Sequence, residues 1–147
     1  MSESREPISD EVRRIFEQAP FIADLGVVLE RVAPGECETS LRLERRHLQQ
    51  DGFAHAGVQA TLADHTAGAA AATLVGPNEY VLTVEFKINL LRPAHGERLR
   101  CHATVLKPGS RIDVVESELW TDDGGESKLV AKAMVTLAVL ARAPRED

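Results

Sequence analysis

The chain has 147 residues, of which 44% are hydrophobic and 27% are charged, and its formal net charge is -6. These proportions are typical of a folded globular domain and exclude the disordered and fibrous classes. Charges of both signs are interspersed, which argues against nucleic acid as a partner. We therefore expect residues 1–147 to form one domain with a continuous core.

The cysteines and the lengths of the apolar runs indicate the cellular compartment of the protein. Cys37 and Cys101 are far apart and form no C-x-x-C pair, which argues against a disulfide framework and a structural zinc site. The polar N-terminus does not resemble a signal peptide, and apolar runs outside the central small-residue segment are shorter than the ~20 residues that cross a bilayer. These features predict a cytoplasmic protein that does not insert into membranes.

The first predicted element is a short amphipathic helix. Apolar residues recur at helical spacing over residues 8–19, and Pro20 ends the run, so residues 1–20 form an N-terminal helical extension. Residues 25–33 and 36–46 follow, separated by a Pro-Gly pair, and the second run alternates apolar and charged side chains. This pattern predicts a β-hairpin.

The longest predicted element is a helix over residues 57–76, which a Gly-Pro pair ends. Its only formal charge is Asp64, and a helix so poor in charge is normally enclosed by other structure. Four strands are predicted after it, at residues 80–93, 98–106, 111–121 and 127–141. This order predicts an α+β fold in which one helix covers a mostly antiparallel six-stranded sheet, with open edges that favour pairing with a second copy.

The chemistry-bearing segment lies around the start of this helix. His55 precedes the helix, the backbone N–H groups of Ala56 and Gly57 open it, and Asp64 follows about two turns later. Because a helix start offers unpaired donors and a positive dipole end, it can polarise a carbonyl and stabilise an oxyanion. A carboxylate and such donors together are parts of an acyl-transfer site.

Each of these side chains also has a structural interpretation. Asp64 could cap a neighbouring loop, His55 could cap the helix, and Thr83 could be an ordinary β-branched strand residue. His65 follows Asp64, but it shares a helical stripe with apolar residues and is better interpreted as a packed histidine than as a metal ligand. The small residues at helical offsets around Asp64 favour the catalytic interpretation of that carboxylate.

The motif resembles that of hotdog-fold thioesterases of the phenylacetate-pathway (PaaI-like) type. Their pattern is Asn-x-x-Gly-x-x-His-Gly-Gly with an aspartate nine residues after the histidine, and Gly52, His55, Gly57 and Asp64 match it in register. Residues 83–93 are similar to the strand that follows the helix in that family. Gln49 stands where the family usually has asparagine, and Ala56 replaces the first glycine of the His-Gly-Gly run.

The resemblance implies a role for each matching residue. Asp64 would act as general base or as nucleophile, and the Ala56 N–H would bind the thioester oxygen. Gln49 and His55 would orient the thioester, and Thr83 would bind the attacking water or position Asp64. Neither a metal nor a redox cofactor is implied. Substrate contacts are expected from Gly57 and from three cations that could bind the phosphates of coenzyme A: Arg92, Lys107 and Arg111.

The resemblance also implies an assembly and a reaction. Ala56 and Asp64 are separated by a rise of ~12 Å, at ~1.5 Å per residue, so one thioester cannot contact both in a single chain. We expect a homodimer with shared active sites, assembled further into a dimer of dimers, that hydrolyses an acyl-CoA. A hotdog dehydratase acting on a 3-hydroxyacyl thioester and a non-catalytic acyl-CoA sensor remain alternatives, and the acyl group stays open.

Overall fold

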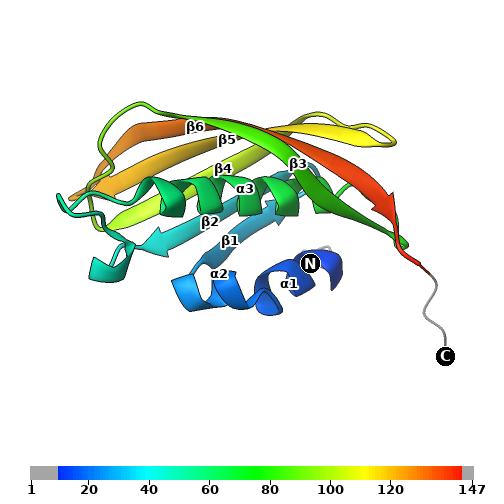
Figure 1. The fold of residues 1–147 in the computed structure, drawn as a ribbon, viewed down its shortest axis with the longest axis horizontal. Coiled ribbons are helices and arrows are strands. Elements are labelled where there is room, and N and C mark those ends of the chain that lie inside the picture. Colours follow the sequence, from blue (N-terminus) through cyan, green and yellow to red (C-terminus); the bar gives the residue numbers. More distant parts are fainter. Residues whose placement is uncertain (1–9, 144–147) are drawn as a thin grey trace, which may run out of the picture.

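The computed structural model describes residues 10–143, and within this range the strands form one antiparallel sheet around a long helix (Figure 1). The elements are α1 (Asp10–Glu17), α2 (Pro20–Leu25), β1 (Val28–Ala33), β2 (Glu36–Arg42), the 3₁₀ turn η1 (Arg45–His47), α3 (Ala56–Ala72), β3 (Glu79–Leu90), β4 (Arg98–Lys107), β5 (Ile112–Asp123) and β6 (Glu126–Ala141). The strand order is β1-β2-β4-β5-β6-β3. The predicted hotdog arrangement of a long helix and a six-stranded antiparallel sheet is confirmed.

The N-terminal segment differs from the prediction, because it forms two helices where one was expected. The helix α1 ends at Glu17, three residues before the predicted end at Pro20, and Pro20 occupies the first turn of α2. Proline suits that position because its missing N–H would have no helical partner there and its φ is already helical. Gly26, with a φ of 87°, ends α2, so β1 begins at Val28 rather than at residue 25. The predicted start of the first helix, at residue 8, lies outside the described residues.

The turn η1 explains why β2 stops at Arg42 and does not continue to residue 46. His47 is buried within this turn, and its Nδ1 accepts the Glu44 N–H at 3.0 Å. That bond places the ring proton on Nε2, which donates to the Leu25 carbonyl at 2.9 Å. His47 therefore ties the end of α2 to the loop that leads into α3.

The helix α3 lies along the concave face of the sheet (Figure 1), and most of its buried residues are alanines. Small side chains let the helix backbone approach the strands closely enough for direct polar contacts. Ser117 Oγ on β5 donates to the Ala63 carbonyl at 2.8 Å, and the hydroxyls of Thr39 on β2 and Thr66 are 2.7 Å apart. These contacts fix the rotation of α3, and with it the direction of Asp64. No helix within residues 10–143 is both long and apolar enough to span a bilayer.

The strand β3 is an edge of the sheet that carries exposed apolar side chains. It pairs with β6 on one side, and no strand of residues 10–143 pairs with its other side. Leu82 is 54% exposed, Val84 62% and Phe86 43%. A long apolar edge strand is normally covered in a native protein, because its free backbone groups and side chains otherwise favour association.

Candidate active site

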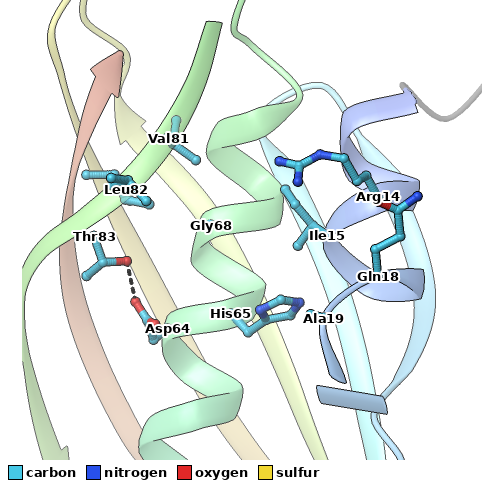
Figure 2. Close-up of a pocket in the computed structure, with 11 residues that line it drawn as sticks. Arg14, Ile15, Gln18, Ala19, Asp64, His65, Gly68, Val81, Leu82 and Thr83 are labelled. Atoms are coloured by element: carbon cyan, nitrogen blue, oxygen red, sulfur yellow. Dashed lines mark hydrogen bonds between the residues drawn. The ribbon is translucent and has the colours of Figure 1, made fainter. Parts of the chain in front are cut away.

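Asp64 and Thr83 form the polar centre of the candidate site. Asp64 lies on the side of α3 that faces β3, and its Oδ1 accepts a hydrogen bond from Thr83 Oγ1 at 2.6 Å (Figure 2). Within the described chain, Oδ2 has no hydrogen-bond partner. A hydroxyl that donates to one oxygen orients the carboxylate and leaves the other oxygen available to a water molecule or a carbonyl carbon.

A β-bulge in β3 aims Thr83 at Asp64. Thr83 pairs with Leu137 and Phe86 with Val135, and both of these β6 residues are buried against the core. Side chains three positions apart on a regular strand would point to opposite faces. The register shift between Thr83 and Glu85 inserts Val84 as an additional residue, so Thr83 and Phe86 both face α3.

Two pockets meet at Asp64, and both are closed partly by the N-terminal helices. The α1 pocket, of ≈ 260 Å³, lies between α1 and β3 and is lined by Arg14, Ile15, Gln18, Ala19, Asp64, His65, Gly68, Val81, Leu82, Thr83 and Leu137 (Figure 2). The α2 pocket, of ≈ 370 Å³, is lined by Ala19, Phe21, Ile22, Ala60, Thr61, Asp64, His65 and Phe86. A carboxylate between two largely apolar pockets can act on a substrate with an apolar group.

The start of α3 offers one backbone donor that is already used and one that is free. His55 is the N-cap, and its Nδ1 accepts the Gly57 N–H at 2.8 Å. The Gly57 N–H, which we expected to contact substrate, is therefore engaged within the chain. The Ala56 N–H opens the helix, has no helical partner, and donates to no acceptor elsewhere in residues 10–143. It is the donor that a bound oxyanion could use.

Gln49 organises the loop before α3. Its Oε1 accepts the backbone N–H groups of Asp51 and Phe53, the latter at 3.3 Å, and its own backbone N–H donates to the Phe53 carbonyl at 2.8 Å. The loop is also joined to residues 47 and 94 by backbone hydrogen bonds from His55 and Ala54. Gln49 thus shapes the approach to His55, while its side-chain nitrogen has no partner in the described part of the chain.

The three cations expected to contact coenzyme A are not gathered in one chain. Arg92 donates to the Leu129 carbonyl at 2.7 Å. It lies two residues before Ala94, whose carbonyl accepts the Ala54 N–H of the loop before α3, so Arg92 is near the start of that helix. Lys107 and Arg111 flank the turn between β4 and β5, near the other end of α3. No group of three or more His, Cys, Asp or Glu side chains within residues 10–143 is arranged to hold a metal ion.

His65 points away from Asp64 and packs under α1, as its helical stripe predicted (Figure 2). Its ring lies edge-on to Phe16, with centroids 4.8 Å apart, and its buried Nε2 has no hydrogen-bond partner within the described residues. Burial lowers the pKa of His65, although the Asp64 carboxylate and the Ile15 backbone oppose that shift. Sequence reasoning missed that Ile15 and Ala19 would wall the pockets, although the apolar face of the predicted N-terminal helix was a signal for it.

The lowered pKa of His65 predicts a pH-dependent stability. As pH falls below the ordinary histidine pKa, the unfolded chain takes up a proton that the folded chain resists, so the free energy of unfolding decreases until pH passes the folded-state pKa. We expect His65→Gln, which keeps an amide donor and does not titrate, to lose less stability than the wild type between about pH 7.5 and 5.5. Denaturant unfolding at both pH values measures this, and equal losses in the two proteins would contradict it.

The six-stranded antiparallel sheet around one long, buried helix is the arrangement of hotdog thioesterase folds. Residues 51–128 match the model of the Thioesterase superfamily, and the chain belongs to this family. The resemblance to hotdog thioesterases noted in the sequence is thereby confirmed.

Individual relatives support this assignment. The crystal structure of a thioesterase family protein from Silicibacter pomeroyi has a TM-score of 0.89 and 37% sequence identity, covering 91% of this chain and 98% of that chain. The E. coli PaaI protein from the phenylacetic acid degradation operon has a TM-score of 0.82 over 92% of this chain and 94% of its own, and at 18% identity it shows the fold alone. The 1,4-dihydroxy-2-naphthoyl-CoA hydrolase of Listeria monocytogenes is 28% identical over 115 residues, covering 78% of this chain and 91% of that protein.

Proposed function

We propose that this protein hydrolyses an acyl-CoA thioester to the free acid and coenzyme A, with Asp64 as the catalytic carboxylate. The observation that carries the proposal is the Asp64 carboxylate, oriented by Thr83 at 2.6 Å where two pockets meet. Thioester hydrolysis is the activity of the family, and the Listeria relative is named a hydrolase of a CoA thioester. The choice of coenzyme A as the carrier rests on that relative.

Two routes use the carboxylate in this position. As general base, Asp64 takes a proton from water while the water oxygen attacks the thioester carbon. The tetrahedral intermediate then expels CoA thiolate, which takes up the proton from Asp64. As nucleophile, it attacks the carbon itself, releases CoA thiolate and forms an anhydride that water then hydrolyses. In both routes Thr83 serves to keep Oδ1 in place and, in the first, to position the water.

The oxyanion that forms on the thioester oxygen needs a donor, and the Ala56 N–H is assigned that role. It lies at the positive end of the α3 dipole, where donors stabilise developing negative charge. His55 Nδ1 already accepts the Gly57 N–H, so a neutral His55 carries its proton on Nε2 and can orient the substrate. The free amide nitrogen of Gln49 provides a second orienting donor.

The active site is proposed to combine two subunits of a homodimer. Asp64 and Ala56 are separated by a rise of ~12 Å along α3, too far for one thioester. A two-fold axis that sets two α3 helices antiparallel brings Asp64 to the partner subunit's Ala56. The unpaired apolar edge of β3 supports the same contact, because pairing two such edges would cover Leu82, Val84 and Phe86. We propose that two such dimers form a tetramer.

Cofactor and location complete the proposal. The mechanism needs neither a metal nor a redox cofactor, since the carboxylate and the backbone donor supply the chemistry. Candidates for contacts with the CoA phosphates are Arg92, Lys107 and Arg111, from either subunit. Arg92 lies near the start of α3 and the other two near its end, and antiparallel pairing of two α3 helices brings the start of one close to the end of the other. The two free, buried cysteines favour a reducing cytoplasm as the site of action.

A panel of CoA thioesters tests the function directly. The protein is incubated with acetyl-, hexanoyl-, dodecanoyl-, benzoyl-, phenylacetyl- and 3-hydroxybutyryl-CoA, and released CoA is followed with a thiol-trapping reagent. We expect CoA release from at least one saturated or aryl thioester. Formation of a double bond from the 3-hydroxyacyl thioester without CoA release would favour a dehydratase, and binding without turnover would favour a sensor. Either result would overturn the proposed hydrolysis.

A further inference from the structure

We infer that the α1 pocket receives the acyl group, and that Gly68 and Ile15 set the largest acyl group that the enzyme accepts. This inference rests on the proposed hydrolysis of an acyl-CoA at Asp64. It assigns the substrate class as a compact apolar acyl group, a short or medium aliphatic chain or a single aromatic ring.

The position and lining of the α1 pocket carry the first step. Asp64 and Thr83 lie at one end of it, Gly68 lies one helical turn further along α3, and Ile15 of α1 lies opposite β3 (Figure 2). Its other contacts with β3 and β6 come from the aliphatic residues Val81, Leu82 and Leu137. The polar side chains of Arg14 and Gln18 are exposed and belong to its rim. A thioester carbon beside Asp64 therefore has an apolar pocket directly adjoining it.

The α2 pocket is a poorer place for the acyl group in the proposed dimer. If Asp64 faces the partner subunit's Ala56, then the positions midway between them on α3, around Ala60, lie at the two-fold axis. Ala60 and Thr61 line the α2 pocket, so the partner's α3 would cover that wall. The α1 pocket lies on the other side of Asp64, toward Gly68, and so away from the two-fold axis.

Gly68 is unfavourable for the helix and is not required by its packing. Glycine in a helix interior lowers stability relative to alanine, because it loses more backbone freedom on folding. A Cβ added at Gly68 would meet only Leu137 Cδ2, at 3.9 Å, which is an ordinary van der Waals contact. Its φ is not in the left-handed region, so the backbone does not need glycine either. The feature that glycine preserves here is the open volume of the pocket.

Ile15 is held over this pocket by the anchoring of α1. His65 packs edge-on against Phe16, and Glu11 pairs with Arg142 at 2.7 Å. The wall opposite β3 is thus a fixed part of the fold. At ≈ 260 Å³ the pocket is slightly below the ~300–1,000 Å³ of typical small-molecule sites, which suits a compact acyl group.

Acyl-length profiles of matched variants test the assignment. The measurement is kcat/KM for acetyl-, butyryl-, hexanoyl-, octanoyl-, dodecanoyl- and phenylacetyl-CoA with the wild type, Gly68→Ala, Gly68→Val and Ile15→Ala. Phe21→Ala, which enlarges only the α2 pocket, is the matched control. Thermal unfolding verifies that each variant is folded, and Gly68→Ala provides a mild change if Gly68→Val is unstable.

We expect the two Gly68 variants to lower kcat/KM for the longest accepted chain and for phenylacetyl-CoA at least ~10-fold, since one methylene in an apolar pocket is worth ~10–200-fold. Acetyl-CoA should change less than about twofold, Ile15→Ala should shift the optimum to longer chains, and Phe21→Ala should leave the profile unchanged. Equal losses for all thioesters in both Gly68 variants, or a shifted profile in Phe21→Ala, would overturn the inference.

Failure of the proposed hydrolysis can be distinguished from failure of the acyl-pocket inference, because the wild type would then release no CoA from any thioester. In that case, titration calorimetry with the same thioesters tests the pocket independently of turnover. A length-dependent loss of affinity in the Gly68 variants would support the acyl pocket. A length-independent affinity would reject it.

Discussion

Replacing Asp64 with asparagine should lower kcat by ~10³-fold or more while the protein stays folded. Asparagine is nearly isosteric, and its side-chain oxygen can still accept the Thr83 hydroxyl at the position of Oδ1. It can neither take a proton from water nor attack a thioester carbon. The loss should therefore appear in kcat, with little change in the affinity for acyl-CoA or in the thermal midpoint.

The matched control for this variant is Asp24→Asn, an identical substitution at an exposed position of α2 outside both pockets. It should retain wild-type activity, which separates loss of the carboxylate at the site from loss of negative charge in general. Steady-state kinetics on the best thioester of the panel measure both variants. Near-normal turnover by folded Asp64→Asn would remove Asp64 from the mechanism.

The main elements of this fold could be predicted because their sequence patterns are local. The charge-poor run around Asp64 predicts a buried helix, and the alternating runs between turn residues predict the strands that pair around it. The strand order was not predicted, because pairing between β2 and β4 depends on contacts across the intervening α3 and β3. The second helix, α2, was missed because Pro20 was interpreted only as the end of a helix, although proline also suits the first turn of one.

The site was only partly predictable because some of its geometry depends on departures from regular periodicity. Alternation along β3 places Thr83 opposite to Phe86, and only the bulge at Val84 turns both toward α3. Likewise, the sequence could not show that His55 engages the Gly57 N–H, since both the cap and a free donor are compatible with the same motif. A Cβ at Gly57 would lie only 3.0 Å from His55 Nδ1, so the absence of a side chain at Gly57 leaves room for the His55 ring that caps the helix.

Replacing Ala56 with proline should remove the oxyanion donor and little else. Ala56 is the first residue of α3, where proline is favoured and the N–H has no helical partner. The preceding residue, His55, has φ −61° and ψ 141°, the extended conformation that a residue before proline prefers. We expect kcat to fall ~10²–10³-fold in a folded protein, whereas Ala56→Gly, which keeps the N–H, should retain most activity. Full activity in folded Ala56→Pro would place the donor elsewhere.

Mixing Ala56→Pro with Asp64→Ala should then restore activity, if each site takes Asp64 from one subunit and the Ala56 N–H from its partner. Each homodimer lacks one component in both sites. A hybrid dimer has one site with both defects and one site with both wild-type groups. After random subunit exchange about half of the dimers are hybrids, so about a quarter of wild-type activity should return. Native mass spectrometry of the mixture verifies that hybrids form. Hybrids that form without activity would show that the shared-site proposal is wrong and that both groups act from the same chain.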